Sequence, residues 1–487
     1  MNDSATDDLM LGIDVGTTAV KVVAFTVGGR PVAAHTTPYP IDRRRPGWAE
    51  QDPLDWWNGC AAGMRAVLST VPARSVRAIG LTSQVNTHVF TDDSLLPLAP
   101  AIVWQDQRCA EIAGELDARF TDEDKIRIWG SPITLDASFV GARAAWFART
   151  HPALWARTRW VMGPKDFVAA KLTGRVATDL LAAVRVAGPN GYLPEAVALV
   201  DGLADRLPDI LEPETLLGRV DGAEVAVGTM DAYSAVFGTR TTEPGRGMIC
   251  CGTSLVVAGA AEQANPAGGI VSFPPRHGLH VHAGPTQAGG DAVRWWSQVS
   301  GLSLAEVFES AADGSPGVVF TPYLSGERAP LWDADVRASF LGLSSATSTA
   351  DLSLAVLQGV AMSGRHVLEA VETACGYPLP HMAFSGGGAR SALWAQIHAD
   401  ILERPVERLR VHDSAALGAA LLGAVGAGIY PDVESAAAAT VEVEHTYVPA
   451  PDADRLRPLY EIYRSTYSAL HDLHTSFAAW RRSAESR

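Results

Sequence analysis

Cysteine is scarce in this 487-residue sequence, and the five cysteines stand without any Cys-x-x-Cys spacing. The adjacent pair Cys250 and Cys251 is poorly placed to form a disulfide with itself. Scattered cysteines of this kind are typical of small core residues in a reducing compartment. They are Cys60, Cys109, Cys250, Cys251 and Cys375.

Long apolar runs and an excess of positive charge are also missing. The first eight residues lack the basic and apolar regions of a signal peptide, and no apolar stretch reaches the roughly 20 residues that a membrane span needs. Lysine and arginine number 39 against 54 acidic residues, a formal net charge of −15. This balance argues against nucleic acid or a membrane as the main partner. We therefore expect a cytoplasmic protein that would bind an anionic nucleotide through local N–H groups and Mg²⁺.

A P-loop of the form GxxxxGK[ST] is absent, but two short glycine-threonine turns take its place. Residues 16–18 and 252–254 each follow an apolar run and precede a second strand-like run. Their backbone N–H groups can form a nest for a polyphosphate, although a single turn of this kind is usually an ordinary hairpin. The repetition favours the phosphate interpretation. Asp14 and Lys21 flank the first turn, where Asp14 could also simply cap it.

The order of predicted elements occurs twice along the chain. The first half predicts strands at 9–13, 20–25 and 31–35, a helix from about 52 to 71, and a strand at 77–82. The second half predicts strands at 248–251 and 255–259, a helix at 352–374, and a strand at 382–385. A chain of this length exceeds what one hydrophobic core normally serves. We expect two α/β domains, each a mixed sheet covered by helices.

Polar or small residues follow several predicted strands. Gln84 follows the strand at 77–82, and Asp231 ends a short strand that leads into small residues suited to a helix start. Ligands of open α/β sheets bind beyond the carboxyl ends of strands, which would place Asp231 at a binding site. An isolated aspartate can equally be a helix cap. Residues 386–388 are three glycines that would let the backbone approach a ligand closely, or would form a flexible loop.

Four motifs carry a resemblance to a known family: residues 48–53 (WAEQDP), 104–108 (WQDQR), 322–330 (PYLSGERAP) and 386–391 (GGGARS). Together with the first turn, they make the sequence similar to the FGGY carbohydrate kinase family, within the actin, hexokinase and Hsp70 type of ATPase fold. The resemblance runs from residue 12 to about residue 420. Within the family, the motifs resemble those of xylulokinase more than those of glycerol kinase.

The resemblance implies a two-lobed α/β fold with the active site in the interlobe cleft. Residues 8–243 would form the N-terminal lobe, with the sugar site, the first phosphate turn and the catalytic aspartate. Residues 244–445 would form the C-terminal lobe, with the second phosphate turn and the nucleoside site, and residues 446–487 a helical extension. Lobe closure would exclude water. A homodimer would match the family pattern.

The implied reaction is phosphoryl transfer from MgATP to a sugar or polyol hydroxyl. Asp231 stands in the family's catalytic-base position, and such a base typically contributes about 10²–10⁴-fold in rate. Asp14 resembles the residue that organises Mg²⁺ near the phosphates. The nucleotide would be contacted by Gly16, Thr17, Thr18, Lys21, Gly252, Thr253, Gly386, Gly387 and Gly388.

The predicted acceptor contacts are Gln84, Val85, Asn86, Trp104, Asp106 and Asp231. Xylulokinases typically have methionine and histidine after the glutamine, where this chain has Val85 and Asn86. Asparagine can exchange hydrogen bonds with hydroxyls but lacks the charge and reach of histidine. D-xylulose is the first acceptor to expect. The alternatives are another ketose or polyol, of the ribulose, erythritol or glycerol type, or an ATPase or sugar sensor that phosphorylates no sugar.

Other conspicuous residues are interpreted structurally. The single histidines His88 and His412 have no metal-ligand spacing, and the Trp56–Trp57 and Trp295–Trp296 pairs are typical of core or interface positions. Lys165 and Asp166 match a family stretch, but a structural ion pair or helix-start charge explains them as well. A chaperone of the same fold would need neither a sugar pocket nor a base directed at a sugar hydroxyl. The motifs therefore favour a kinase.

Overall fold

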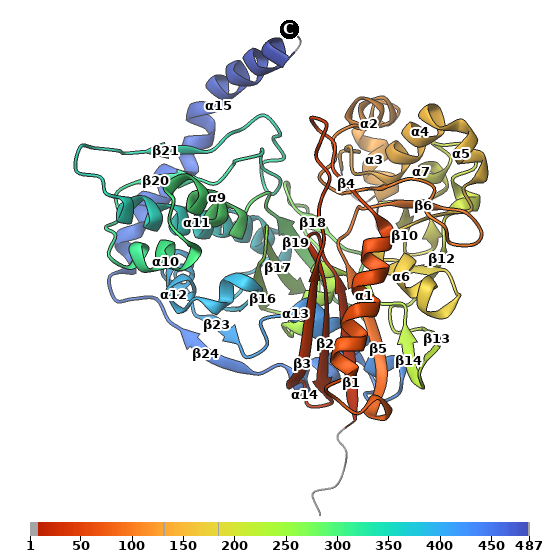
Figure 1. Cartoon of the computed structure of the whole chain (residues 1–487). Coiled ribbons are helices and arrows are strands. Elements are labelled where there is room, and N and C mark those ends of the chain that lie inside the picture. Colours follow the sequence, from red (N-terminus) through yellow and green to blue (C-terminus); the bar gives the residue numbers. More distant parts are fainter. Residues whose placement is uncertain (1–7, 130–131, 184, 486–487) are drawn as a thin grey trace, which may run out of the picture. The chain divides into compact units, whose positions relative to one another are not determined.

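The computed structural model describes residues 8–129, 132–183 and 185–485, and the chain divides into two compact units (Figure 1). Unit 1 comprises the chain up to Gly238 together with Ser414–Thr440. Unit 2 comprises Thr239–Asp413 and Val441–Arg487. Each unit is therefore built from two separate segments of the chain.

Unit 1 is organised around a mixed sheet with the strand order β13-β14-β5-β1-β2-β3, and β15 also pairs with β5. The strands are β1 (Leu9–Val15), β2 (Ala19–Thr26), β3 (Pro31–Pro38), β5 (Val76–Ser83), β13 (Leu216–Val220), β14 (Ala223–Ala226) and β15 (Thr229–Met230). Strand β1 is antiparallel to β2 and parallel to β5, and β14 and β15 are also parallel to β5. The strands predicted at 9–13, 20–25 and 31–35 are confirmed, and they form an antiparallel meander.

Helices cover both faces of this sheet. Helix α1 (Pro53–Leu68) packs against β2 and β3, whereas α13 (Ser414–Gly426) packs against β1 and β5 and against α8 (Asp231–Gly238). Helix α1 begins where expected, because Asp52 accepts a hydrogen bond from Leu54 N at 2.9 Å and Pro53 occupies the first turn. Its buried face repeats at helical spacing and consists of Trp56, Gly59, Cys60, Gly63, Met64 and Val67.

Two glycines allow α13 to lie directly on the sheet. A Cβ atom added to Gly80 would lie 1.6 Å from the carbonyl oxygen of Ala419, and one added to Gly12 would lie 1.9 Å from that of Ala416. Any other side chain would have to displace the helix backbone. The small residues of the sequence 415–420 therefore serve close packing.

Substitution of Gly80 by alanine is expected to lower the free energy of unfolding by about 1–3 kcal/mol, because the added methyl overpacks a site that faces backbone. Urea unfolding would measure this loss. Gly114 is the matched control, because it is exposed in α2 (Ala110–Asp117) and an added Cβ meets no atom within 4 Å. Gly114→Ala is expected to be neutral or stabilising by up to about 1 kcal/mol. Equal effects of the two substitutions would contradict this account of the packing.

The rest of unit 1 contains a second apolar core, in which Phe90 stacks on Phe147, whereas residues 167–169 and Ala177 pack in the core of the sheet. The elements of this part of unit 1 are β4 (Glu50–Gln51), β6 (Val89–Thr91), β7 (Ala101–Ile102), α2, α3 (Asp122–Trp129), α4 (Val140–Thr150), α5 (Pro152–Arg157), β8 (Trp160–Met162), α6 (Pro164–Thr173), β9 (Ala177–Asp179), β10 (Ala187–Gly188), β11 (Gly191–Tyr192), α7 (Pro194–Val197) and β12 (Asp209–Leu211). Helix α14 (Val433–Thr440) follows α13. Short 3₁₀ helices lie at Ala73–Ser75 and Ala204–Arg206.

Unit 2 repeats the topology of unit 1. Its sheet has the order β18-β19-β17-β16-β22-β23-β24, with β16 antiparallel to β17 and parallel to β22. Strand β23 is parallel to β22 and antiparallel to β24, as β14 is to β5 and β13. The strands are β16 (Arg246–Cys251), β17 (Leu255–Ala261), β18 (Val271–Ser272), β19 (His280–Pro285), β22 (His381–Ser385), β23 (Val406–Leu409) and β24 (Val443–Tyr447). The duplication predicted from the sequence is thus present in the strand connections.

Helix α11 (Thr349–Cys375) is the central helix of unit 2 and packs against β17 and β19. It begins with a capping box, in which Ser348 and Asp351 bond to each other's backbone, and it ends at Gly376 in the left-handed conformation. The remaining elements are α9 (Gly290–Ser300), α10 (Leu304–Ala312), β20 (Val319–Thr321), β21 (Ser339–Leu341), α12 (Ala392–Leu402) and α15 (Arg457–Glu485), with short 3₁₀ helices at Gly387–Arg390 and Ala453–Leu456.

The division into units differs from the contiguous lobes expected at 8–243 and 244–445 with an extension at 446–487. Ser414–Thr440 belongs to unit 1, because α13 packs on β1 and β5. The C-terminal segment is helical as expected but belongs to unit 2, since β24 pairs with β23 and the buried Tyr463 of α15 lies 2.8 Å from Tyr323, hydroxyl to hydroxyl. Sequence patterns locate helices and strands but do not say which sheet a helix covers.

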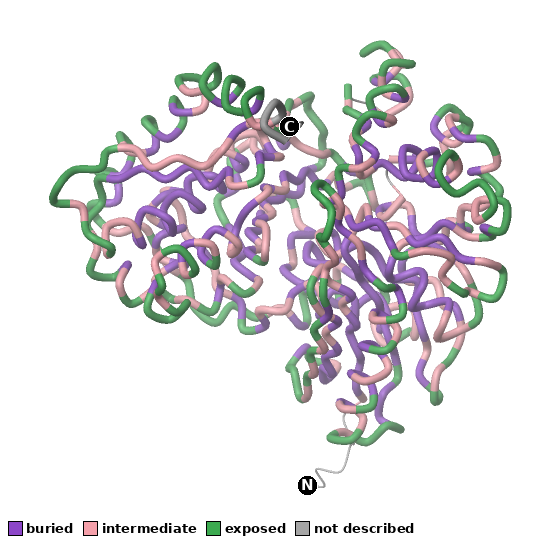
Figure 2. Tube along the Cα trace, turned by 45° about the horizontal axis from the view of Figure 1, so that its top comes forward, coloured by how far each residue is buried: buried purple, intermediate pink, exposed green. Residues whose placement is uncertain are grey.

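Buried residues follow the central strands and the inner faces of the helices within each unit (Figure 2). Trp56 is fully buried and Trp296 nearly so, as expected for core positions. All five cysteines are free thiols. In the part of the chain that the structure describes, none of the helices has the length and apolar character that a membrane crossing requires.

Candidate active site

The first glycine-threonine turn connects β1 and β2 and is fixed from two sides. Gly16 N donates to the carbonyl of Ala19 at 3.0 Å, and Tyr39 N donates to the carbonyl of Thr18 at 3.1 Å. The Tyr39 hydroxyl donates to the carbonyl of Gly16. Burial, reinforced by the nearby charges of Asp14 and Asp55, raises the pKa of Tyr39, so the hydroxyl keeps its proton. Sequence reasoning did not single out Tyr39.

Asp14 and Lys21 are directly opposite each other in the β1–β2 pair, at the two ends of this turn. A Cβ atom on Gly16 would lie 3.9 Å from Asp14 Oδ1, so the carboxylate lies beside the turn. Among the described residues, no group of three or more histidine, cysteine, aspartate or glutamate side chains could hold a metal ion. A single carboxylate beside the turn is compatible with Mg²⁺, because this ion often takes one carboxylate and completes its shell with water and phosphate oxygens.

Two predicted site residues, Gln84 and Asp231, lie at one edge of the unit 1 sheet. Gln84 N donates to the carbonyl of Val15 at 3.0 Å, which places Gln84 next to the first turn. Met230 is paired with Ser83 in the parallel β15–β5 register, so Asp231 and Gln84 follow adjacent strand ends. Asp231 is partly exposed and opens α8, where its Oδ1 accepts a hydrogen bond from Ala232 N at 2.8 Å. Asp231 therefore also serves as the first residue of α8, the helix-cap alternative considered from the sequence.

Gln51, a member of the WAEQDP motif to which sequence reasoning gave no role, connects these parts. Its Nε2 donates to the carbonyl of Thr17 at 2.6 Å, and its Oε1 accepts from Gln84 Nε2 at 2.8 Å and from Trp56 Nε1 at 3.1 Å. The buried side chain thus links the first turn to the end of β5. Trp104 reaches the same turn, because its Nε1 lies 3.1 Å from Thr17 Oγ1.

The carboxylate of Asp106 is not available for a sugar contact, because it is buried and bonded within the protein. It is fully buried, its Oδ2 accepts from Ala49 N at 2.6 Å, and both carboxylate oxygens accept from the Arg108 guanidinium at 2.6–3.0 Å. Arg108 also donates to Glu50 at 2.7 Å. These bonds occupy the acceptor sites of Asp106 and hold together the segments that carry two of the family-like motifs. The geometry thus favours a supporting role for Asp106 over direct contact with a sugar.

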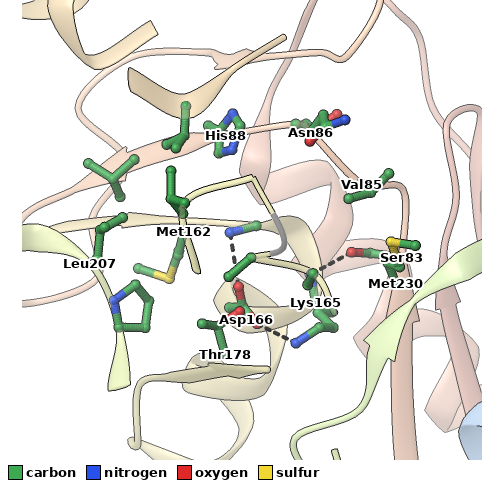
Figure 3. Close-up of a pocket in the computed structure, with 18 of the residues that line it drawn as sticks. Ser83, Val85, Asn86, His88, Met162, Lys165, Asp166, Thr178, Leu207 and Met230 are labelled. Atoms are coloured by element: carbon green, nitrogen blue, oxygen red, sulfur yellow. Dashed lines mark hydrogen bonds and ion pairs between the residues drawn. The ribbon is translucent and has the colours of Figure 1, made fainter. Parts of the chain in front are cut away.

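A small cavity, in which about 60 Å³ is accessible to the centre of a water molecule, lies beside Gln84. Figure 3 shows residues that line it. Val85, Asn86 and His88 line it on the side of the β5–β6 loop, and Met162 and Leu207 contribute apolar walls. Asn86 has a φ of +54°, a left-handed conformation that asparagine tolerates better than most residues. This bend gives the residues after Gln84 a fixed shape at the cavity.

A buried ionic cluster borders this cavity. Lys165 Nζ lies 2.6 Å from Asp166 Oδ1 and 3.0 Å from Asp179 Oδ1, and Asp179 Oδ2 accepts from Thr229 Oγ1 at 2.7 Å. Ser83 Oγ accepts from Lys165 N at 3.1 Å (Figure 3). Burial works against the charge of Lys165, but the two aspartates outweigh it and raise the pKa of Lys165. The ion pair considered from the sequence is present, and Asp179 is an additional member that sequence spacing did not indicate.

The second turn, in unit 2, is held by Gly289 and the first two residues of α9. Gly289 N and Asp291 N donate to the carbonyl of Thr253 at 2.9 and 3.1 Å, and Gly290 N donates to that of Gly252 at 2.9 Å. Arg294 of α9 lies 3.2 Å from Thr253 Oγ1, which places a cation at the turn that sequence reasoning did not identify.

The triple-glycine loop lies at the same edge of the unit 2 sheet as this turn, because Ser385 is paired with Cys250. Gly386 has a φ of +82°, and an added Cβ would lie 2.6 Å from the carbonyl oxygen of Cys251. A Cβ on Gly388 would lie 2.9 Å from the Cys251 side chain, whereas one on Gly387 would meet no atom within 4 Å. Two of the three glycines are therefore required by close packing, and Gly387 is the exposed one.

Glu327, in the PYLSGERAP motif, supports the loop before α9. The carboxyl group is buried, and its Oε1 accepts from Gln287 N at 2.6 Å and from Arg328 N at 2.8 Å. Burial raises the pKa of Glu327 to about 7, from an ordinary value of 4.5. Because Gln287 precedes Gly289 and Gly290 by two and three residues, Glu327 fixes the segment that holds the second turn.

Glu327→Gln is expected to flatten the dependence of stability on pH. The carboxyl group of Glu327 titrates at a higher pH in the folded than in the unfolded protein, so its stabilising contribution is complete below pH 4.5 and is lost as the pH rises through 7. Relative to the wild type, the variant should gain up to about 3 kcal/mol between pH 4.5 and 8, measured by urea unfolding. The exposed Glu309 provides the control substitution. Parallel pH profiles of wild type and Glu327→Gln would contradict this assignment.

Two sequence profiles match the chain. The profile described as "FGGY family of carbohydrate kinases, N-terminal domain" matches residues 9–221, and the corresponding C-terminal domain matches residues 247–427. A xylulose kinase of Staphylococcus epidermidis is 27% identical over 493 residues, covering 95% of this chain and 96% of that protein. A gluconokinase of Bacillus subtilis is 26% identical over 509 residues, covering 97% and 98%.

Solved structures give the same picture. A crystal structure described as a xyloylose kinase from Brucella ovis is 29% identical, with a TM-score of 0.83, covering 96% of this chain and all of that one. A ligand-bound xylulose kinase from Lactobacillus acidophilus has a TM-score of 0.86 at 21% identity, which bears on the fold alone. The expected fold, an α/β chain of two domains with mixed sheets flanked by helices, is confirmed.

Proposed function

Because this chain belongs to the FGGY family of carbohydrate kinases and is thereby an ATP-dependent sugar kinase, we propose that its acceptor is D-xylulose. The proposal is supported by the xylulose kinases among its relatives and by the small polar site at the end of β5. The relationship to a gluconokinase makes gluconate the acceptor to test against it.

The observation that carries the mechanism is the adjacency of Asp231 and Gln84 at two parallel strand ends. In the proposed reaction, the acceptor hydroxyl gives its proton to the Asp231 carboxylate as its oxygen bonds to the γ-phosphorus of ATP. The bond from that phosphorus to the β,γ-bridging oxygen breaks, and ADP leaves. The role of Asp231 is to hold the hydroxyl in line and to take the proton.

The phosphates would be bound by the two glycine-threonine turns through backbone N–H groups. In unit 1, Thr17 and Thr18 add hydroxyls, and Lys21 adds a cation opposite Asp14. In unit 2, residues 252 and 253 form the turn, and Gly386–Gly388 would approach the nucleoside. Asp14 would hold Mg²⁺, which neutralises phosphate charge when bound.

Acceptor recognition is assigned to Gln84, Val85, Asn86 and Trp104. Gln84 Oε1 has no hydrogen-bond partner among the described residues, so a sugar hydroxyl could satisfy it. The Asn86 amide can both donate to and accept from hydroxyls. Asp106 is given the supporting role that its buried bonds to Ala49 and Arg108 favour.

The test is ADP release with MgATP across D-xylulose, D-ribulose, erythritol, glycerol and gluconate, with the phosphorylated product confirmed by mass. The highest kcat/KM with D-xylulose is the expected result. A higher value for another acceptor would overturn the substrate assignment and make Val85 and Asn86 the first positions to exchange. ADP release without a phosphorylated sugar would instead support the ATPase or sensor alternative.

The remaining expectations from the sequence stay predictions. They are a homodimer, a cytoplasmic location, and a closure of the protein around its substrates that excludes water. Size-exclusion chromatography with light scattering would test the first of these.

A further inference from the structure

Arg143 of α4 is a buried cation behind the proposed acceptor site. Its side chain has no solvent-exposed surface, yet its hydrogen bonds reach three segments of chain. The guanidinium donates to the carbonyls of Ile102 and Val103, each at 2.7 Å, and to that of Ala137 at 3.2 Å. It also donates to the carbonyl of Asn86.

The environment keeps this group charged while making it costly to bury. Burial lowers the pKa of Arg143 to about 10, which still leaves it protonated at neutral pH. Its Nη1 lies 3.1 Å from Nδ1 of His88. Burial and Arg143 together lower the pKa of His88 well below its ordinary value, so the imidazole is neutral and can accept the hydrogen bond. A buried guanidinium is tolerated only when its donors are satisfied in this way.

The bonded carbonyls identify what Arg143 organises. Asn86 belongs to the loop that follows Gln84, and its left-handed φ of +54° must be held by neighbouring groups. Val103 immediately precedes Trp104, whose backbone N is bonded to Thr87 Oγ1 at 3.1 Å. The guanidinium therefore joins the loop of Asn86 to the strand end that carries Trp104.

We propose that Arg143 is a positioning residue that sets the separation of Asn86 and Trp104 and thereby determines which acceptor fits. The inference rests on the proposed acceptor site. The planar guanidinium bonds to four carbonyls in fixed directions. A lysine in the same position is a single point donor that cannot span them.

The test is steady-state kinetics of Arg143→Lys and Arg143→Ala with both substrates varied. Arg143→Lys is expected to raise the KM for the acceptor about tenfold or more and to change the ratio of kcat/KM between two acceptors, since small misplacements of binding groups have large effects. The KM for MgATP should stay within about threefold. For Arg143→Ala, added guanidinium ion should lower the raised acceptor KM part of the way to the wild-type value. A general loss of stability would not predict this rescue.

Arg149→Lys is the matched control, because Arg149 is on the same helix but is exposed and paired with Glu115 at 2.8 Å. A folded Arg143→Lys enzyme with wild-type acceptor KM and acceptor preference would overturn the proposal. Should neither Arg143 variant fold, His88→Ala removes one contact of Arg143 and keeps the cation. It is then expected to raise the acceptor KM severalfold, and an unchanged KM would overturn the proposal.

Asn86→Ala separates this inference from the proposed acceptor site. If Asn86→Ala leaves the acceptor KM unchanged, the acceptor site itself is wrongly assigned. If Asn86→Ala raises that KM but a folded Arg143→Lys enzyme does not, the site is correct and the role of Arg143 is refuted.

Discussion

Replacement of Asp231 by asparagine is expected to lower kcat for sugar phosphorylation by about 10²–10⁴-fold, because asparagine cannot accept the proton of the attacking hydroxyl. The local structure should survive, since asparagine retains the Oδ1 acceptor that bonds to Ala232 N at the start of α8. The measurement is kcat with saturating D-xylulose and MgATP, together with MgATP affinity by calorimetry. The affinity is expected to change little.

The control for this substitution is Asp221→Asn, at an exposed turn between β13 and β14 with a φ of +49° that asparagine readily adopts. It should leave kcat unchanged. Near-normal turnover of Asp231→Asn would show that another group takes the proton. Loss of MgATP binding would show instead that Asp231 serves mainly to shape the site.

Substitution of Lys165 by methionine is expected to lower the free energy of unfolding by about 3–5 kcal/mol. Without the ammonium group, Asp166 and Asp179 would face each other as buried carboxylates with no compensating charge. Burial already raises the pKa of Asp166, and removal of Lys165 would raise it further. Urea unfolding at pH 7 provides the measurement.

Lys171 offers the comparison for this experiment, because it is on the same helix, α6, and is only partly buried beside the ring of Trp57. Lys171→Met should cost less than about 1 kcal/mol. If Lys165→Met costs no more than Lys171→Met, the ionic cluster contributes little to the stability of unit 1. If the loss is smaller at acidic pH than at pH 7, protonation of Asp166 compensates for the missing ammonium group.

Much of the fold followed from local patterns. Asp52 and Pro53 indicated the start of α1, and the apolar runs at 9–13 and 20–25 indicated β1 and β2. The placement of Gln84 and Asp231 at strand ends could be expected because each directly follows an apolar strand-like run. Local patterns sufficed here because each element carries its own periodicity and capping signals.

The sequence could not show which residues far apart in the chain form hydrogen bonds or ion pairs with each other. Lys165, Asp179 and Thr229 meet across more than 60 residues of chain, and no periodicity connects them. Arg143 bonds to backbone carbonyl groups. Every residue has such a group, so the sequence does not reveal which residues are the partners. Asp106 is part of the WQDQR motif, but only the structure shows that its carboxylate oxygens already accept hydrogen bonds within the protein.

The division of unit 1 into two segments of chain also has a consequence for synthesis on the ribosome. Helix α13, which covers β1 and β5, begins after the intervening residues 239–413, about 175 residues beyond the segment that ends at Gly238. At roughly 5–20 residues per second, the nascent sheet would wait on the order of 10–40 s for its missing layer. During that interval the face of the sheet that carries Gly12 and Gly80 lacks the helix that covers it in the folded protein.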